Sequence, residues 1–115
     1  MRVRVSSSGY VTETNYIVFD IPYEHANQFT IYRDGAKLVS NDPTKGLAPF
    51  EHPTMFDMDH QTNLFRKDTM HKLMYIDKDV QKYQRYSYYV IAEHVDENGN
   101  VVSSVQSNTY SVQTQ

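Results

Sequence analysis

Apolar and polar side chains alternate with a period of two in several short stretches of this chain, which predicts β-strands. Near the start, Val3 and Val5 alternate with Arg2 and Arg4, a pattern that suits a strand at the edge of a sheet. A second strand is predicted over "NYIVFDIP" (15–22), whose one apolar face carries Ile17, Phe19 and Ile21. It ends at Pro22, because proline has no N–H to donate to a neighbouring strand.

The stretch "FTIYRDGAKLVS" predicts two strands joined by a tight turn. Phe29 and Ile31 point to one face, and Thr30 and Tyr32 point to the other. The turn falls at Asp34-Gly35, because a hairpin turn that follows the strand twist needs positive φ, which glycine adopts freely.

The clearest strand is "YSYYVIAEHV" (86–95). One of its faces carries Tyr86, Tyr88, Val90 and Ala92, and the other carries Ser87, Tyr89, Ile91 and Glu93. A turn at Asn98-Gly99 follows, and "SNTYSVQT" closes the chain with Tyr110 and Val112 on one face. The pattern therefore predicts an all-β protein, an antiparallel sandwich of about seven strands.

The segment from about Ser40 to Leu73 breaks this rhythm and is interpreted as an insertion. It combines turn-forming residues with apolar ones, among them Leu47, Phe50, Met55, Phe56, Met58, Leu64, Phe65 and Met70. Disordered linkers are poor in such residues, so the segment is expected to pack on the rest of the domain. A structureless loop of this length is unusual, and a short helix is predicted within "TNLFRKDTMHKL" (62–73).

The 115 residues predict a single domain, 1–115. The net charge is −3, and the only basic clusters are Arg2/Arg4 and Arg66-Lys67, which disfavours a nucleic-acid partner. No apolar run approaches the ~18 residues that cross a membrane, and "MRVRVSSSGY" lacks the apolar core of a signal peptide. The absence of cysteine excludes disulfides, thiol catalysis and thiolate metal sites.

From Tyr16 onward, over roughly 80 residues, the order of these signals resembles a fibronectin type III domain. The resemblance rests on "FTIYRDG" and on "YIDKDVQKYQRYSYYVIAEHVDENGNVVSSVQSNTYSVQT". It implies an immunoglobulin-like sandwich in which Tyr86 is the corner tyrosine, whose hydroxyl bonds to nearby backbone. The family's strand-B tryptophan is missing here, Lys82 stands where proline is frequent, and the insertion at 40–73 lengthens the connection between strands C and E.

Candidate metal ligands are densest around "DMDH". If a metal binds, the ligand candidates are Asp57, Asp59 and His60, with His52 converging on them in a loop. The spacing of these residues favours a solvated polar turn instead. No nucleophile elbow or glycine-rich phosphate loop is present, so no catalytic residue and no cofactor are assigned.

The outward face of the two central strands is the main candidate for binding. Tyr32, Tyr89 and Ile91 would form an apolar patch there, where a solvated sheet face alternates more cleanly. Two explanations stay open. In the favoured explanation, the insertion covers the patch with Phe50, Phe56, Phe65 or Leu64. In the other, the patch binds another protein or a sugar ring.

The expected role is a non-enzymatic structural or adhesion module that makes protein–protein contacts. The resemblance implies an accessory protein of a phage or prophage virion, or another protein at an extracellular surface, with self-association as one option. The alternative is a spacer or carbohydrate-binding module of a secreted bacterial enzyme or adhesin.

Overall fold

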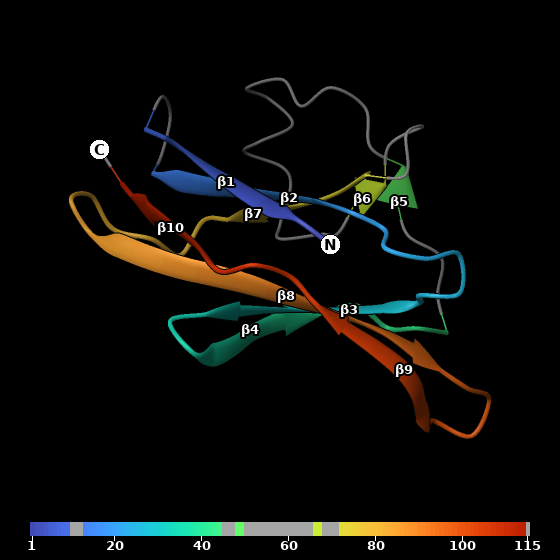
Figure 1. The fold of residues 1–115 in the computed structure, drawn as a ribbon. Helices are drawn as coiled ribbons and strands as arrows, with labels where there is room; N and C mark the ends of the chain where they lie inside the picture. Colours follow the sequence, from blue (N-terminus) through green and yellow to red (C-terminus); the bar gives the residue numbers. More distant parts are fainter. Residues whose placement is uncertain (10–12, 45–47, 50–65, 68–71, 115) are drawn as a thin grey trace.

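The protein folds as two facing β-sheets, as Figure 1 shows. The computed structural model describes residues 1–9, 13–44, 48–49, 66–67 and 72–114, and within them every regular element is a strand. The fold class predicted from the alternation, an all-β sandwich, is therefore confirmed.

The first sheet has the strand order β1-β2-β7-β6-β5. Its strands are β1 (Val3–Ser8), β2 (Thr14–Asp20), β7 (Lys72–Asp77), β6 (Arg66–Lys67) and β5 (Ala48–Pro49). All pairs in it are antiparallel except β5 with β6, which is parallel. β1 lies at the edge, as the Arg/Val alternation predicts.

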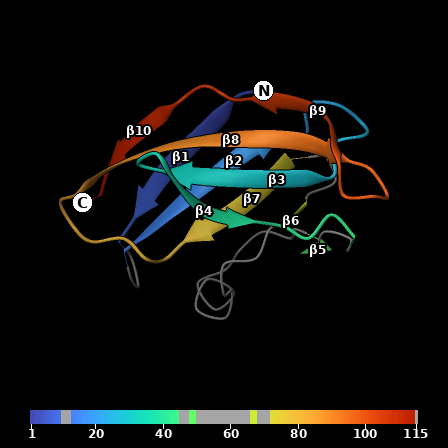
Figure 2. The same ribbon diagram turned by 90° about the horizontal axis from the view of Figure 1, so that it is seen from below.

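The second sheet is antiparallel throughout and has the order β10-β8-β3-β4, with β9 also paired to β8. Its strands are β3 (Gln28–Arg33), β4 (Ala36–Ser40), β8 (Arg85–Val95), β9 (Val101–Gln106) and β10 (Tyr110–Gln113). Figure 2 shows β3, β4 and β8 layered over β1, β2 and β7. The long strand β8 runs the length of this sheet and pairs with β3 and with the two C-terminal strands, β9 and β10.

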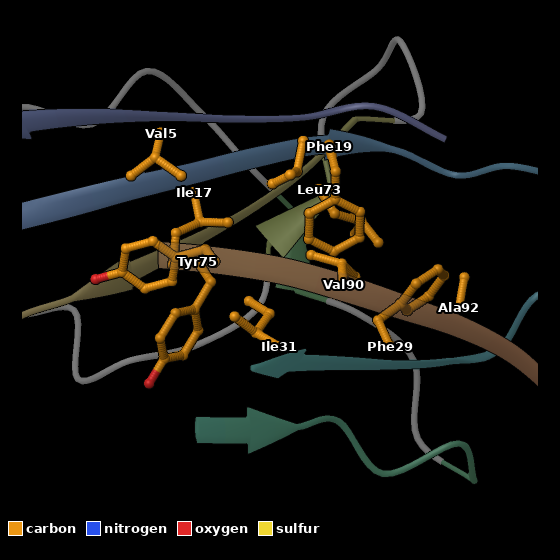
Figure 3. Close-up of a cluster of buried hydrophobic side chains, with 11 residues drawn as sticks. Val5, Ile17, Phe19, Phe29, Ile31, Leu73, Tyr75, Val90 and Ala92 are labelled. Atoms are coloured by element: carbon orange, nitrogen blue, oxygen red, sulfur yellow. The ribbon is translucent and has the colours of Figure 1, made fainter. Parts of the chain in front are cut away.

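The core lies between the sheets and is built from the inward residues of the period-two pattern. Figure 3 shows side chains from both layers meeting there. The rings of Phe19 on β2 and Phe29 on β3 lie 5.7 Å apart. The core cluster consists of Val3, Val5, Ile17, Phe19, Phe29, Ile31, Leu73, Tyr75, Tyr88, Val90 and Ala92.

Both predicted turns are confirmed. Arg33 pairs with Ala36, and the two residues between them have positive φ, 53° at Asp34 and 83° at Gly35, as a two-residue hairpin turn needs. Gly99 has φ 82° in the turn after β8, where the Asp96 carboxylate accepts hydrogen bonds from the backbone N–H groups of Asn98 and Asn100, both at 2.9 Å.

One detail of the sequence prediction is wrong. A helix over 62–73 is excluded, because Arg66–Lys67 and the start of β7 at Lys72 are strands within that window. The described residues hold ten strands. Beyond the roughly seven expected, the insertion contributes β5 and β6, and β9 comes before the predicted closing strand, which contains β10.

Candidate functional site

Two tyrosines stack on the outer face of the second sheet. Tyr32 on β3 and Tyr89 on β8 are directly paired across the strands, and each alternates with residues that enter the core. Their ring centroids lie 4.8 Å apart and the ring planes differ by 7°. Both side chains are half-buried. A cross-strand aromatic pair of this kind stabilises the sheet and presents an apolar ridge to solvent.

Further residues extend this ridge and surround it with polar groups. Ile91 on β8 lies opposite Thr30 on β3 and is half-buried on the same face. The residues paired to the ridge on its flanks are polar: Lys37, Ser40 and Gln106. The resulting outer patch, defined as Thr30, Tyr32, Tyr89 and Ile91, has an apolar centre and a polar rim, the layout typical of protein-binding surfaces.

The structure brings together three of the predicted partner-binding residues and does not describe the others. Tyr32, Tyr89 and Ile91 share the outer patch. The aromatic residues expected to cover it, Phe50, Phe56 and Phe65, lie outside the described residues, as does Leu64. The same holds for the candidate metal ligands His52, Asp57, Asp59 and His60.

The described part of the insertion lies in the other sheet. β5 and β6 extend the first sheet beside β7. On β7, Met74 and Ile76 alternate with the core residues Leu73 and Tyr75, so they point to the outer face of the first sheet. They are nevertheless only 7% and 1% exposed. Because β5 and β6 are strands of the first sheet, they belong to the layer opposite Tyr32 and Tyr89, which lie on the second.

A buried polar cluster, which the sequence pattern did not indicate, connects the two sheets. Asp77 at the end of β7 accepts hydrogen bonds from Arg33 at 2.9 and 3.2 Å and from the Tyr88 hydroxyl at 2.8 Å. The Tyr88 hydroxyl accepts a hydrogen bond from the Asn15 amide at 2.9 Å. Because Arg33 and Tyr88 belong to one sheet and Asn15 and Asp77 to the other, the cluster fastens the layers at one end of the sandwich.

The protonation of this cluster follows from burial and from the Asp77 charge. Burial alone lowers the pKa of Arg33, but the hydrogen bond and the charge of Asp77 outweigh it and raise that pKa. Burial raises the pKa of the Tyr88 hydroxyl well above its ordinary value, and Asp77 adds to the rise. Burial also raises the pKa of Tyr75, to about 12. Arginine stays charged and both tyrosines stay neutral at ordinary pH.

The raised tyrosine pKa values predict a loss of stability in alkali. Tyr75 ionises near pH 10 in the unfolded chain but only near 12 in the folded one, so the folded state binds more protons in between. The contribution of Tyr75 to the free energy of unfolding is therefore constant below pH 10 and falls as the pH rises from 10 to about 12. Urea unfolding at a series of pH values checks this, with Tyr75→Phe as the variant expected to show a shallower fall. An equally steep fall in Tyr75→Phe would contradict the assignment.

An open hollow with acidic residues lies where β8 ends, at the far end of the strand from the Asp77 cluster. One part, of about 520 Å³, is lined by Asn27, His94, Val95, Asp96, Glu97 and Asn98. A second, of about 320 Å³, shares Asn27, Val95, Asp96 and Glu97 and adds Pro43, Thr44 and Gly99. We call this the end hollow. The sequence carried no signal for it, since its lining comes from three separate connections.

Neither a metal centre nor a membrane span is found in the described part of the chain. There, no three histidine or acidic side chains gather as they would around a metal ion, and no helix is long and apolar enough to cross a membrane.

Comparisons with known proteins give no relative. No family model matches the chain, and neither a curated protein nor a solved structure matches it. The chain is thus assigned, on its own geometry, to two-sheet antiparallel β-sandwich proteins.

Proposed function

We propose that this chain is a fibronectin type III-like module. Two observations support the proposal. β1, β2 and β7 share one sheet while β3, β8 and the C-terminal strands share the other, which is the division of strands A, B, E and C, F, G in immunoglobulin-like sandwiches. The Tyr86 hydroxyl accepts a hydrogen bond from the backbone N–H of Gln81 at 2.9 Å, the contact of a corner tyrosine.

The proposed role is a non-enzymatic structural or adhesion module that binds another protein through the outer patch. The Tyr32–Tyr89 stack carries this proposal, because an apolar aromatic pair at the centre of a polar-rimmed sheet face is the composition of a protein contact. The setting proposed for such a module is a virion or another extracellular surface.

The geometry of the stack favours a protein partner over a sugar. Sugar rings pack against the open face of an aromatic ring, whereas Tyr32 and Tyr89 cover one face of each other at 4.8 Å. Each ring then has one face closed to a sugar, and its edge and hydroxyl group add contact points for a partner. Those groups suit the mixed apolar and polar contacts of a protein surface.

The test measures binding of the purified chain to the purified products of the genes beside its own, by biolayer interferometry, with a glycan array in parallel. We expect at least one of these proteins to bind the chain. The double variant Tyr32→Ser/Tyr89→Ser should bind that protein at least tenfold more weakly, because it loses the aromatic anchor at the centre of the contact. The matched control is Ser87→Ala/Ser111→Ala, which removes a 2.8 Å hydroxyl pair from the same sheet face and should bind normally.

Binding that the tyrosine variant leaves unchanged would contradict the role of the outer patch. Glycan binding without protein binding would favour the alternative, a carbohydrate-binding module, and no binding in either assay would count against both.

A further inference from the structure

Tyr83 has an unusual backbone conformation for an aromatic residue. Its φ is 60°, in the left-handed region that bulky side chains rarely adopt. Its side chain is 75% exposed, the highest value among the exposed large hydrophobic residues described. Glycine or asparagine would fit this position at lower conformational cost, and the ring gains little from burial in return.

Hydrogen bonds on both sides hold the turn that carries Tyr83. Gln81 donates its N–H to the Tyr86 hydroxyl at 2.9 Å, and the Thr114 hydroxyl bonds the carbonyl oxygen of Gln81. Gln84 donates its N–H to Thr114 Oγ1 at 3.0 Å and accepts from the Thr114 N–H at 2.9 Å. A strained residue persists where surrounding structure fixes it in this way, and such residues concentrate at binding sites.

The segment that carries Tyr83, residues 78–85, holds three basic residues and one acidic residue. Lys82 and Arg85 flank the turn and are exposed, and Lys78 lies nearby along the chain. Asp79 is the acidic residue of this stretch, and its carboxylate lies 3.6 Å from Arg33. The turn therefore presents an aromatic knob with positive charge beside it.

The end hollow has the complementary character. Asp96 and Glu97 line both of its parts, Val95 supplies an apolar contact, and the described lining contains no lysine or arginine. His94 also lines it, and its Nδ1 lies 2.6 Å from the carbonyl oxygen of His25.

The knob and the hollow lie at opposite ends of β8. The turn precedes this strand at Arg85 and the hollow begins where it ends at Val95. Figures 1 and 2 both show the connection before β8 and the turn into β9 at opposite ends of the molecule, whose longest dimension is 41 Å. One copy therefore cannot place its own Tyr83 in its own hollow.

We propose that two copies of this chain bind head to tail, with the Tyr83 turn of one copy seated in the end hollow of the next. Lys82 and Arg85 then face Asp96 and Glu97. The contact joins two different surfaces, so it leaves one free knob and one free hollow, and further copies add to form a ring or a filament. It uses neither Tyr32 nor Tyr89, so it stands apart from the proposed outer-patch function. A single knob in an open hollow buries little area, so each contact is weak.

Sedimentation velocity on the purified chain over a range of concentrations tests this. We expect growth beyond the dimer as concentration rises, and weaker association in high salt because charges of opposite sign face each other. The variants Tyr83→Gly and Glu97→Lys should each self-associate at least tenfold more weakly than the wild-type chain. Tyr83→Gly should also raise Tm by a few degrees, since it removes the left-handed strain. The control Arg4→Glu alters an exposed charge on the first sheet and should associate normally.

Mixing the two damaged variants gives the decisive result. Tyr83→Gly keeps an intact hollow and Glu97→Lys keeps an intact knob, so the mixture should form dimers and nothing larger. A wild-type chain that stays monomeric at the highest concentration, a Tyr83→Gly variant that associates like wild type, or a mixture that stays monomeric would each overturn the proposal.

Discussion

Replacing Asp77 by alanine is expected to destabilise the folded protein by about 3 kcal/mol, because removing one partner of a buried pair leaves the other charge uncompensated. The Asp77 side chain is 1% exposed and that of Arg33 is 22% exposed. The buried Tyr88 hydroxyl loses its acceptor as well. We place the expected loss at the low end of the range for buried pairs, since Arg33 retains some contact with water.

Urea unfolding of Asp77→Ala beside wild type measures this loss. The matched control is Asp79→Ala, which removes a carboxylate that is 88% exposed and also near Arg33. That variant should lose less than about 1 kcal/mol, as exposed ion pairs do. Equal losses in the two variants would show that the buried cluster does not fasten the sheets.

The second large effect is expected in the core. Phe29→Ala should destabilise the protein by roughly 3–5 kcal/mol, because a buried aromatic ring is replaced by a cavity that the sheets fill only in part. Phe29 is 1% exposed and packs on Phe19 from the opposite layer. For a domain whose whole stability is of order 5–15 kcal/mol, such a loss brings the protein near unfolding at ambient temperature.

Thermal unfolding followed by circular dichroism measures the effect of Phe29→Ala. The control Tyr83→Ala removes an aromatic ring that is 75% exposed and should not lower Tm. A Tm for Phe29→Ala close to that of wild type would mean that the two sheets do not pack through this contact.

Local signals in the sequence were sufficient for β3, β4 and β8 of the second sheet. The alternation from Tyr86 to Ala92 orients β8 correctly, and Asp34-Gly35 marks the hairpin between β3 and β4. Both signals depend on residues a few positions apart, and short-range geometry determines them. The outer patch follows from the same alternation, because the pairing of Tyr32 with Tyr89 needs only that β3 and β8 be neighbours.

Long-range contacts could not be predicted in the same way. Arg33 and Asp77 are 44 residues apart, and no pattern around either residue indicates the other. The window at 62–73 shows the limit of local preference, since strand pairing with β7 takes precedence over a helical pattern there. The left-handed φ of Tyr83 was equally hidden. The turn is held by hydrogen bonds that the backbone N–H groups of Gln81 and Gln84 donate to the hydroxyls of Tyr86 and Thr114, and the residue type argues against such a φ.

The most direct test of the proposed protein-binding role is amide chemical-shift mapping of the chain, titrated with whichever neighbouring gene product binds it. We expect the largest shifts to cluster on the outer face of β3 and β8, around Thr30, Tyr32, Tyr89 and Ile91. Shifts confined to the first sheet or to residues 41–72, with the outer patch unchanged, would contradict it.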